Sequence, residues 1–434
     1  MNEEKDRAIL VGLQLNDGSS FEHNLEELES LCQACDIAPV FTITQSLDAP
    51  HQALYIGSGK VHEVKEAAAN LDADLIIFDN ALSPSQARNL NLEIGLPILD
   101  RTALILEIFQ SRARSREAKL QVELARLQYL LPRLSGMGTA MSRQGGGSGS
   151  RSNKGAGEKK LELDRRHISH RITECKKELQ TIKKQRVTQR KSRNASQTPS
   201  VALVGYTNAG KSTILNAMLS HYGNDEITDI SHKKVLQEDM LFATLDTTVR
   251  KITIPGKPAF YLSDTVGFID KLPHHLIDAF RSTLEEAIGA DLLLQVVDVS
   301  DPYYREHMRV TQDTLNDLGA GDIPMIIAYN KADRLPQFAH DLPIVTGNHI
   351  HMAAGADLGM DALADLILSN LFGKPVTMEL LIPSSQGSLV HRISEAGEVA
   401  KTEYQNDGTY MQVTFTPSAK DHALMQEVAS YRIG

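Results

Sequence analysis

Short apolar runs alternate with helical stretches over the first 111 residues. Strands are predicted at 8–13, 39–43, 53–57, 75–79 and 97–99, and helices near 22–35, 59–70, 84–92 and 101–110. Strands and helices in alternation are typical of a mostly parallel α/β domain. The pattern therefore predicts an N-terminal α/β domain over residues 1–111.

The hydrophobic period changes at residue 112. Leucines step by four and three positions from Leu120 to Leu134, and apolar residues repeat this spacing from Ile168 to Ile182. Two such stripes joined by a loop predict an antiparallel helical hairpin whose two faces bury each other. We assign this hairpin to 112–196, with a first helix over about 112–134 and a glycine-rich tip over 135–157.

Strand and helix alternation returns after a polar linker at 191–200. Strands are predicted at 201–206, 259–264, 292–300, 323–330 and 343–347, each followed by a helical segment, which indicates a doubly wound α/β domain over 197–373. In the final stretch, 374–434, the pattern predicts a strand, a helix near 384–396, a hairpin around "NDG" and a last helix. This small α+β domain carries no motif that indicates its task.

Charge is unevenly distributed along the chain. The net charge is −10, but residues 151–193 hold fifteen Lys and Arg against five acids, so this segment carries +10 and the remainder −20. A basic arm on an acidic body suggests a surface made for a polyanion.

The N-terminus has no basic segment followed by an apolar core, and the run at 292–299 is too short to cross a bilayer, so we expect a cytoplasmic protein.

The cysteines and histidines form no recognisable metal or redox site. Cys32 and Cys35 lie on a predicted helix that also carries Leu28 and Leu31, and no second pair completes a zinc site. We interpret them, and Cys175, as core residues. His167 and His170 are interpreted as part of a solvated helix face for the same reason.

The segment "GSGK" at 57–60 resembles part of a phosphate-binding loop. A complete loop requires a glycine where Leu54 stands and Ser or Thr where Val61 stands. We interpret the segment as a strand-to-helix turn. A weak second nucleotide site remains the alternative.

A complete phosphate-binding motif follows the strand at 201–206. "GYTNAGKS" at 205–212 has the form G-x-x-x-x-G-K-S and opens a predicted helix. Gly205 and Gly210 let main-chain N–H groups approach the phosphates, Lys211 reaches the β and γ oxygens, and the Ser212 hydroxyl binds Mg²⁺. The sequence therefore predicts a nucleoside triphosphate site here.

The segment "NKAD" at 330–333 selects the base. Asp333 can accept hydrogen bonds from the N1–H and the exocyclic amine of guanine, whereas adenine would leave its carboxylate unpaired. Asn330 is expected near N7 of guanine, with the aliphatic part of Lys331 over the ring. GTP is therefore the predicted ligand.

Two further loops are predicted to contact the γ-phosphate. Asp264 of "DTVG" (264–267) is expected at the Mg²⁺, and the Gly267 N–H at the γ-phosphate. In "FATLD" (242–246), Thr244 is the candidate that closes on Mg²⁺ when GTP is bound, with Thr247 and Thr248 as competitors. Lys211, Thr244 and Gly267 are the predicted catalytic residues, and Ser212 and Thr244 the predicted metal ligands.

The full set predicted to contact GTP spans five segments. Its members are Gly205, Tyr206, Thr207, Asn208, Ala209, Gly210, Lys211 and Ser212; Phe242, Ala243, Thr244, Leu245 and Asp246; Asp264, Thr265, Val266 and Gly267; Asn330, Lys331, Ala332 and Asp333; and Ala353 with Ala354.

Phe268 stands where hydrolytic GTPases often carry a glutamine that orients the attacking water. A phenyl ring neither donates a hydrogen bond to water nor accepts one as an amide does. We therefore expect slow intrinsic hydrolysis and activation by a partner.

The tip of the hairpin is the candidate nucleic-acid contact. Basic residues on a glycine-rich backbone suit a crevice lined with phosphates, and such contact is insensitive to sequence but sensitive to salt. The residues predicted to contact rRNA are Arg143, Arg151, Lys154, Lys159 and Lys160. A dimerisation or spacer element is the alternative interpretation of the hairpin.

The order of these segments resembles the HflX family of GTPases. The resemblance covers about 1–373 and rests on "YIGSGK", "LSPSQARNL", "LDRTALILEIFQSRARSREAKLQ", "KKLELDRRHI", "GYTNAGKS", "LFATLDTT", "DTVGFI" and "FRSTLEEA". Two positions depart from the family pattern: Ala156 replaces a proline of the tip, and Met352 stands before Ala353 where a serine is typical of the last guanine loop. The segment 221–239 is also longer than in the family.

The resemblance implies a bacterial factor that binds the large ribosomal subunit, with the hairpin tip toward the peptidyl transferase centre. It implies GTP hydrolysis stimulated by ribosomes, splitting of stalled ribosomes under heat or other stress, and an ATP-binding or RNA-remodelling activity of the N-terminal domain. We therefore expect a monomeric, cytoplasmic, partly ribosome-associated GTPase. Its expected partners are GTP or GDP, Mg²⁺, and the large subunit with its rRNA. A GTPase that assists large-subunit assembly, an ATP-driven RNA remodeller and a dimerising interaction protein are the alternatives.

Overall fold

The fold is described from a computed structural model of the chain. It describes residues 5–15, 21–134, 152–195, 198–223, 242, 248–271, 287–338, 340–374, 376–405, 407–415 and 419–433; side chains of the long second hairpin helix are described for 162–185, and those of the last α-helix from Leu424. The chain divides into two compact units. The first contains 1–191, 238–246 and 266–284, and the second contains 192–237, 247–265 and 285–434.

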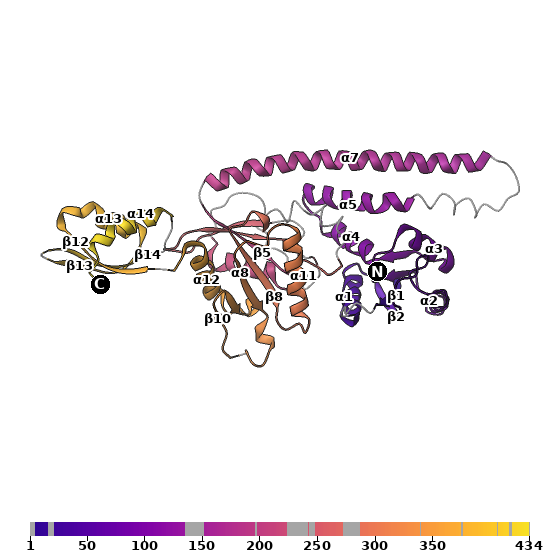
Figure 1. Cartoon of the computed structure of the whole chain (residues 1–434), viewed down its shortest axis with the longest axis horizontal. Helices are drawn as coiled ribbons and strands as arrows, with labels where there is room; N and C mark the ends of the chain where they lie inside the picture. Colours follow the sequence, from indigo (N-terminus) through magenta and orange to yellow (C-terminus); the bar gives the residue numbers. More distant parts are fainter. Residues whose placement is uncertain are drawn as a thin grey trace. The chain divides into compact units, whose positions relative to one another are not determined.

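The N-terminal domain is a parallel sheet flanked by helices (Figure 1). The strands β1 (Arg7–Gln14), β2 (Ala38–Ser46), β3 (Leu75–Phe78) and β4 (Ile98–Asp100) lie in the order β2-β1-β3-β4, and every neighbouring pair is parallel. The helices are α1 (Phe21–Ala34), α2 (Ser58–Asn70), α3 (Pro84–Ile94) and α4 (Arg101–Arg112). The predicted α/β fold is confirmed.

One predicted strand of this domain is wrong. Residues 53–57 form no strand, and only a single antiparallel bridge joins His51 to Tyr55. Tyr55 has a φ of 67°, which places it in the left-handed region and interrupts an extended run. Gly57 of "GSGK" caps α2, and Ser58 to Lys60 form the first turn of that helix, where Lys60 pairs with Glu63 at 2.7 Å.

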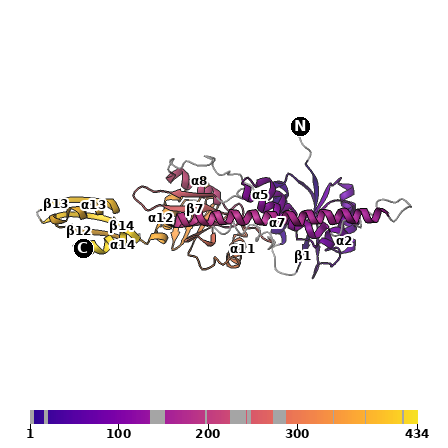
Figure 2. The ribbon, with the colours of Figure 1, turned by 90° about the horizontal axis from the view of Figure 1, so that it is seen from above.

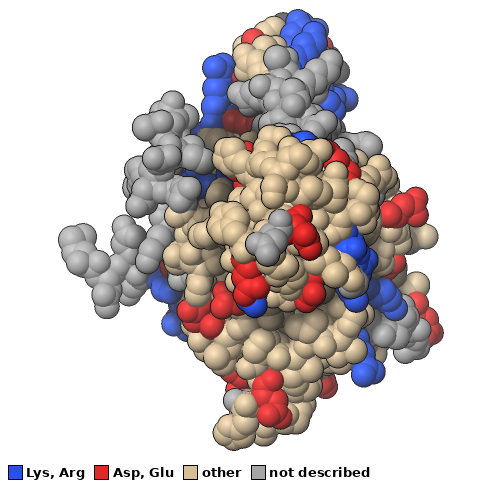
Figure 3. Space-filling model, turned by 90° about the vertical axis from the view of Figure 1, so that its left-hand side faces the viewer, with Lys and Arg blue, Asp and Glu red and all other residues tan. Residues whose placement is uncertain are grey.

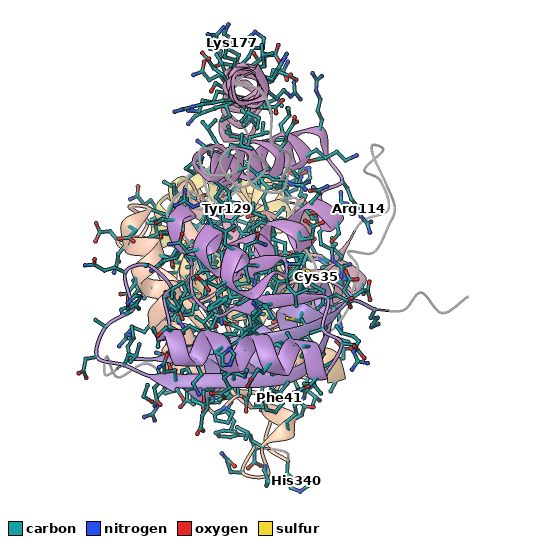
Figure 4. All side chains as sticks on the ribbon, turned by 90° about the vertical axis from the view of Figure 1, so that its right-hand side faces the viewer. Cys35, Phe41, Arg114, Tyr129, Lys177 and His340 are labelled. Atoms are coloured by element: carbon teal, nitrogen blue, oxygen red, sulfur yellow. The ribbon has the colours of Figure 1, made fainter. Side chains whose placement is uncertain are left out.

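Cys32 and Cys35 carry no disulfide and are not activated thiols. Cys32 is buried in the core beside Leu28 and Leu31, and burial raises its pKa to about 12. The Cys35 thiol lies 3.7 Å from the Leu104 carbonyl oxygen, and burial raises its pKa to about 12 as well (Figure 4). A raised pKa disfavours the reactive thiolate, in keeping with a packing role.

The hairpin is built from α5 (Arg116–Leu134) and α7 (Ser152–Ala195), which lie side by side (Figures 1 and 2). Arg116 pairs with Glu178 at 2.7 Å, and the Arg171 guanidinium forms two hydrogen bonds with Glu123, so the two helices run antiparallel. The predicted stripes meet as a buried cluster of Leu120, Leu124 and Cys175, with Ile172, Leu179 and Ile182 packed against it. The predicted hairpin is therefore confirmed.

The boundaries of the hairpin differ from the prediction in three places. The first helix begins at Arg116 rather than near 112, because α4 ends at Arg112. Residues 152–157, predicted as part of the glycine-rich tip, belong to the first turns of α7, and 191–195, predicted as linker, belong to its last turn. A long helix extends through neighbouring residues at small cost, since a glycine costs only about 1 kcal/mol relative to alanine.

The second compact unit contains a seven-stranded sheet in the order β10-β11-β9-β8-β5-β7-β6. Its strands are β5 (Ser200–Val204), β6 (Thr248–Ile252), β7 (Phe260–Asp264), β8 (Leu292–Asp298), β9 (Met325–Asn330), β10 (Ile344–Thr346) and β11 (His349–His351). All pairings are parallel except those of the two edge strands, β6 and β10. Helices α8 (Lys211–Tyr222), α11 (Tyr304–Asp317) and α12 (Met360–Phe372) complete the doubly wound domain, whose fold was predicted. The strands β6 and β11 were not predicted, and β10 is followed by β11 rather than by the expected helix.

The C-terminal residues form the predicted α+β module. Strands β12 (Val376–Ile382), β13 (Glu398–Gln405) and β14 (Gly408–Phe415) are antiparallel in the order β12-β14-β13, with helices α13 (Gly387–Ala396) and α14 (Ala419–Val428). The face in Figure 3 is largely uncharged, with acidic and basic side chains scattered over it. Across the described segments of the chain, no helix has both the length and the apolar character that a membrane span requires.

Candidate functional site

The loop between β5 and α8 has the backbone that a phosphate cradle requires. Gly205 and Gly210 have φ values of 142° and 95°. A Cβ at Gly205 would lie 2.3 Å from the Val296 oxygen, and one at Gly210 would lie 2.3 Å from Nδ2 of Asn330. Because both glycines are needed for conformation and for space, the loop can wrap closely around phosphates at the N-terminus of α8.

Lys211 is the first residue of α8 and is almost fully buried. Its ammonium donates hydrogen bonds to the main-chain oxygens of Gly205 (3.0 Å) and Tyr206 (2.7 Å). Burial lowers the pKa of Lys211 to about 8, although the nearby Asp264 carboxylate acts in the opposite direction. Phosphate oxygens would offer this desolvated cation stronger acceptors than the two carbonyls.

The oxygen ligands predicted for Mg²⁺ lie together. The Ser212 hydroxyl donates to Oδ2 of Asp264 at 2.7 Å, and Asp264 is fully buried at the end of β7. The adjacent Thr265 hydroxyl donates to the Leu203 carbonyl oxygen at 2.6 Å, which ties this strand end to β5. A hydroxyl and a carboxylate within contact are the hard oxygen donors that suit Mg²⁺, so these residues fit the predicted metal.

Asn330 links two of the predicted nucleotide loops. Its side-chain amide donates to the Ala209 oxygen at 2.9 Å, and its side-chain oxygen accepts from the Ala354 N–H at 3.0 Å. The Ala353 N–H is itself bonded to the Leu358 oxygen. Asn330 therefore positions the phosphate loop and the loop at 353–354, a role that the motif alone did not reveal.

Lys331 and Asp333 border the predicted base site. Lys331 has a φ of 59°, and its ammonium contacts the Asn208 oxygen (2.8 Å) and the Asp298 carboxylate (2.7 Å). Ala332 is buried and begins the short 3₁₀ helix Ala332–Arg334, while Asp333 in that helix is exposed. This arrangement leaves the Asp333 carboxylate at the surface, where a guanine edge can reach it.

Other predicted site residues are placed only in part. Ala243, Thr244, Leu245 and Asp246 lie outside the described residues, as do Thr247, Arg143 and Arg151. Lys154, Lys159 and Lys160 lie on the helical backbone of α7, and their side chains are not described. Val266 and Gly267 are buried directly after Thr265. Thr248 is the first residue of β6.

Two described residues next to the predicted γ-phosphate loops contact the N-terminal domain. Phe242 has a φ of 56° and packs edge-on against Phe109 of α4, with ring centroids 4.7 Å apart. The Lys271 ammonium lies 2.6 Å from Oδ2 of Asp79, at the end of β3. These segments therefore pack within the first compact unit, which sequence reasoning did not anticipate.

Asp79 belongs to a buried ionic network. Arg101 is 1 % exposed and contacts both Asp79 and Glu27 at 2.6 Å, and it also donates to the Asn24 oxygen. Lys271 supplies a second cation to Asp79. A buried carboxylate requires such compensation, so its bond to Lys271 fixes the segment after Gly267.

We expect Lys271→Met to loosen this segment. Loss of a hydrogen bond to a charged group costs about 1.5–3 kcal/mol, and Arg101 still compensates Asp79, so the effect should be local. Hydrogen exchange measured by mass spectrometry should become faster in 266–271 and remain unchanged in β5. The matched control is Lys257→Met, which removes a surface pair with Asp365. Equal protection of 266–271 from hydrogen exchange in the variant and the parent would show that the Lys271–Asp79 contact does not hold this segment.

The doubly wound sheet, the phosphate cradle, the Ser212–Asp264 pair and the Asn330–Asp333 loop define a P-loop GTPase. Family models agree: "GTP-binding GTPase N-terminal" matches 22–110, "GTP-binding GTPase Middle Region" matches 112–193, and "50S ribosome-binding GTPase" matches 200–331. The chain belongs to the GTPase HflX family.

Curated relatives share nearly the full length of the chain. The GTPase HflX of Lacrimispora saccharolytica is 41% identical over 96% of this chain and 95% of its own length. The GTPase HflX of Escherichia coli is 37% identical over 93% and 92%. Among solved structures, a GTP-binding protein from Sulfolobus solfataricus in complex with GDP is 24% identical, covers 84% of this chain and 98% of that chain, and has a TM-score of 0.42. The family activity, GTP hydrolysis, agrees with the predicted enzyme class.

Proposed function

We propose that this GTPase binds the large ribosomal subunit and splits or rescues stalled ribosomes, under stress in particular. Its basic helical hairpin carries the proposal. On α7, Lys176 and Lys177 are exposed, and Lys177 lies on the side away from α5 (Figure 4). The side that faces α5 is occupied by apolar packing and by the Arg171–Glu123 pair. Among the described side chains, Lys176 and Lys177 on the outer face are therefore exposed and can meet an RNA backbone.

The hairpin also favours RNA over self-association. The cluster of Leu120, Leu124 and Cys175 is buried between the two helices of the hairpin, so this part of the stripe requires no second copy to cover it. The name of the family model for 200–331 refers to binding of the 50S ribosome. Together these observations support a factor that acts on ribosomes as a monomer. We propose in addition that it is cytoplasmic and that Arg143, Arg151, Lys154, Lys159 and Lys160 contact rRNA.

In the proposed reaction, water attacks the γ-phosphorus of GTP. A bond forms between the water oxygen and phosphorus, and the bond to the β–γ bridging oxygen breaks, with its electron pair left on GDP. The water protons pass to the phosphate product and to solvent. Lys211 holds the β and γ oxygens, the Gly267 N–H contacts the γ-phosphate, and Asp333 holds the guanine.

Magnesium is the proposed cofactor, held by Ser212 and Thr244 with Asp264 beside it. When bound, Mg²⁺ neutralises charge on the β and γ oxygens. The buried Asp264 carboxylate orients the Ser212 hydroxyl in this arrangement.

The proposal is tested by GTP hydrolysis with and without purified large ribosomal subunits. The intact chain is compared with one in which a short Gly/Ser link replaces 143–157. We expect subunits to accelerate hydrolysis by the intact chain and to affect the shortened chain less. Joined ribosomes followed by light scattering should separate on addition of the intact chain with GTP. Action on immature particles alone would favour the assembly factor, and no effect of subunits would exclude both.

A charge reversal on the outer face of α7 gives a second test. The double variant Lys176→Glu, Lys177→Glu should weaken binding to large subunits and lower the slope of log affinity against log salt by roughly 1.5, since each lost phosphate contact removes about 0.7–0.9. The matched control is Lys401→Glu in β13, outside the hairpin. An unchanged salt slope in the double variant would indicate that this face does not contact RNA.

A further inference from the structure

The phosphate loop contains a buried hydroxyl group that lacks a hydrogen bond. Thr207 is 7 % exposed, and its Oγ1 has no hydrogen-bond partner among the described residues. Leaving a buried polar group unsatisfied costs about 1–3 kcal/mol. A valine has the same shape and would avoid this cost. The hydroxyl therefore calls for a partner that arrives with the ligand.

The loop on both sides of Thr207 is held in place. The Tyr206 ring stacks on His307 of α11, with centroids 3.9 Å apart and an interplanar angle of 11°. On the other side, Asn208 has a φ of 57°, and its carbonyl oxygen accepts from Lys331. Because both neighbours are anchored, the loop cannot easily shift to give Thr207 a protein partner.

Four carbonyl oxygens of the loop already accept a hydrogen bond from a side chain other than that of Thr207. Lys211 bonds the oxygens of Gly205 and Tyr206, Lys331 bonds that of Asn208, and Asn330 bonds that of Ala209. A phosphate oxygen is the acceptor that enters a loop of this class when GTP binds. Thr207 lies in the half of the loop before Gly210, away from the first turn of α8, where main-chain amides meet the inner phosphates.

At the position after Gly267, where hydrolytic GTPases often carry a water-orienting glutamine, the chain has a phenylalanine. Phe268 is 2 % exposed and carries no hydrogen-bonding atom on its side chain at the position expected to orient the nucleophile. A threonine hydroxyl has one donor and two acceptor lone pairs, so it can contact a phosphate oxygen and a water at once. A phenyl ring cannot form these two hydrogen bonds.

We propose that Thr207 positions the attacking water. Its O–H donates to an oxygen of the γ-phosphoryl group, and its lone pair accepts a hydrogen bond from the water that attacks the γ-phosphorus. Because GDP lacks the γ-phosphoryl group, the hydroxyl contributes to the affinity for GTP and not to the affinity for GDP. The inference rests on the family's GTP hydrolysis and is independent of the proposed action on ribosomes.

The test compares Thr207→Val with Thr207→Ser in the full chain, without ribosomes. Misplacement of a reacting group can cost roughly 10²-fold in rate, so Thr207→Val should lower kcat for GTP by about that factor. Affinity for fluorescently labelled GDP should stay unchanged, while preference for a non-hydrolysable GTP analogue over GDP declines. Thr207→Ser, which retains the hydroxyl, should restore most of the rate.

Thermal unfolding of the nucleotide-free protein separates this role from a structural one. Thr207→Val should unfold at the same or a higher temperature, because it removes an unsatisfied polar group. The control is Thr311→Val on α11, whose hydroxyl donates to the His307 oxygen and whose loss should lower the unfolding temperature. The proposal is overturned if Thr207→Val keeps the parent kcat. It is also overturned if the variant loses stability, or if affinity for GDP and for the GTP analogue falls equally.

Discussion

Replacement of Lys211 by alanine is expected to lower GTP turnover by about 10²–10³-fold, the loss typical of removing one donor from a charge-stabilising site. Lys211 is buried at the phosphate loop, and its two hydrogen bonds to the loop oxygens show that its ammonium already points into the cradle. Steady-state release of phosphate from GTP measures the effect. The control, Lys257→Ala, removes an exposed ammonium from the same sheet domain and should preserve the rate.

The lowered pKa of Lys211 adds a pH dependence to this result. Without nucleotide, the pKa is lowered to about 8, so the amine loses its proton as the pH rises through that value. Phosphates favour the charged form, and GTP binding above pH 8 should therefore weaken and be accompanied by proton uptake. Calorimetry in two buffers of different ionisation enthalpy would detect the uptake. Lys211→Ala should abolish it, and uptake that persists in this variant would assign the titration to another group.

Replacement of Asp333 by asparagine is expected to weaken GTP binding by about 10⁴-fold, because a site built for paired hydrogen bonds strongly rejects a mismatched partner. The asparagine amide would place N–H groups opposite the N1–H or the exocyclic amine of guanine. Xanthine has a carbonyl oxygen in place of that amine, so xanthosine triphosphate should bind the variant better than GTP does. Competition binding with the two nucleotides measures the switch.

The exchange of nucleotide preference is also the control for this variant. An unfolded or distorted site would bind neither nucleotide, whereas a site that has only lost its guanine contacts would gain affinity for xanthosine triphosphate. Asp341→Asn, in the loop before β10, should leave both affinities unchanged. Preserved GTP affinity in Asp333→Asn would show that the exposed carboxylate does not read the base.

The fold was largely predictable because each part has its own hydrophobic period. Alternation placed the four strands of the N-terminal sheet and five of the seven strands of the second sheet, and it missed β6 and β11. The heptad stripes placed Leu120 and Leu124 against Cys175. The failures were local. Tyr55 is apolar enough to suggest a strand, but its backbone is left-handed. The glycines of 152–157 suggest a loop, but neighbouring helix extends through them. Periodicity records which side chains are buried and is insensitive to single backbone conformations.

The site was predictable where chemistry depends on neighbours in sequence. "GYTNAGKS" and "NKAD" each bring their functional groups together through one turn. Contacts between distant segments carried no such signal. The stack of Tyr206 on His307 joins residues about a hundred positions apart. Lys271 follows the hairpin in the sequence, whereas its partner Asp79 precedes it. Such pairs follow from tertiary packing, which a single sequence does not display.

The partners of Phe242 and Lys271 lie in α4 and at the end of β3. An excised fragment that begins near residue 197 would retain every recognisable nucleotide motif and yet lose both contacts. It would also expose the Phe242 ring and leave Lys271 without Asp79. Measurements on such a fragment would therefore describe an enzyme with a released segment after Gly267, and its rate would be a poor guide to that of the whole chain.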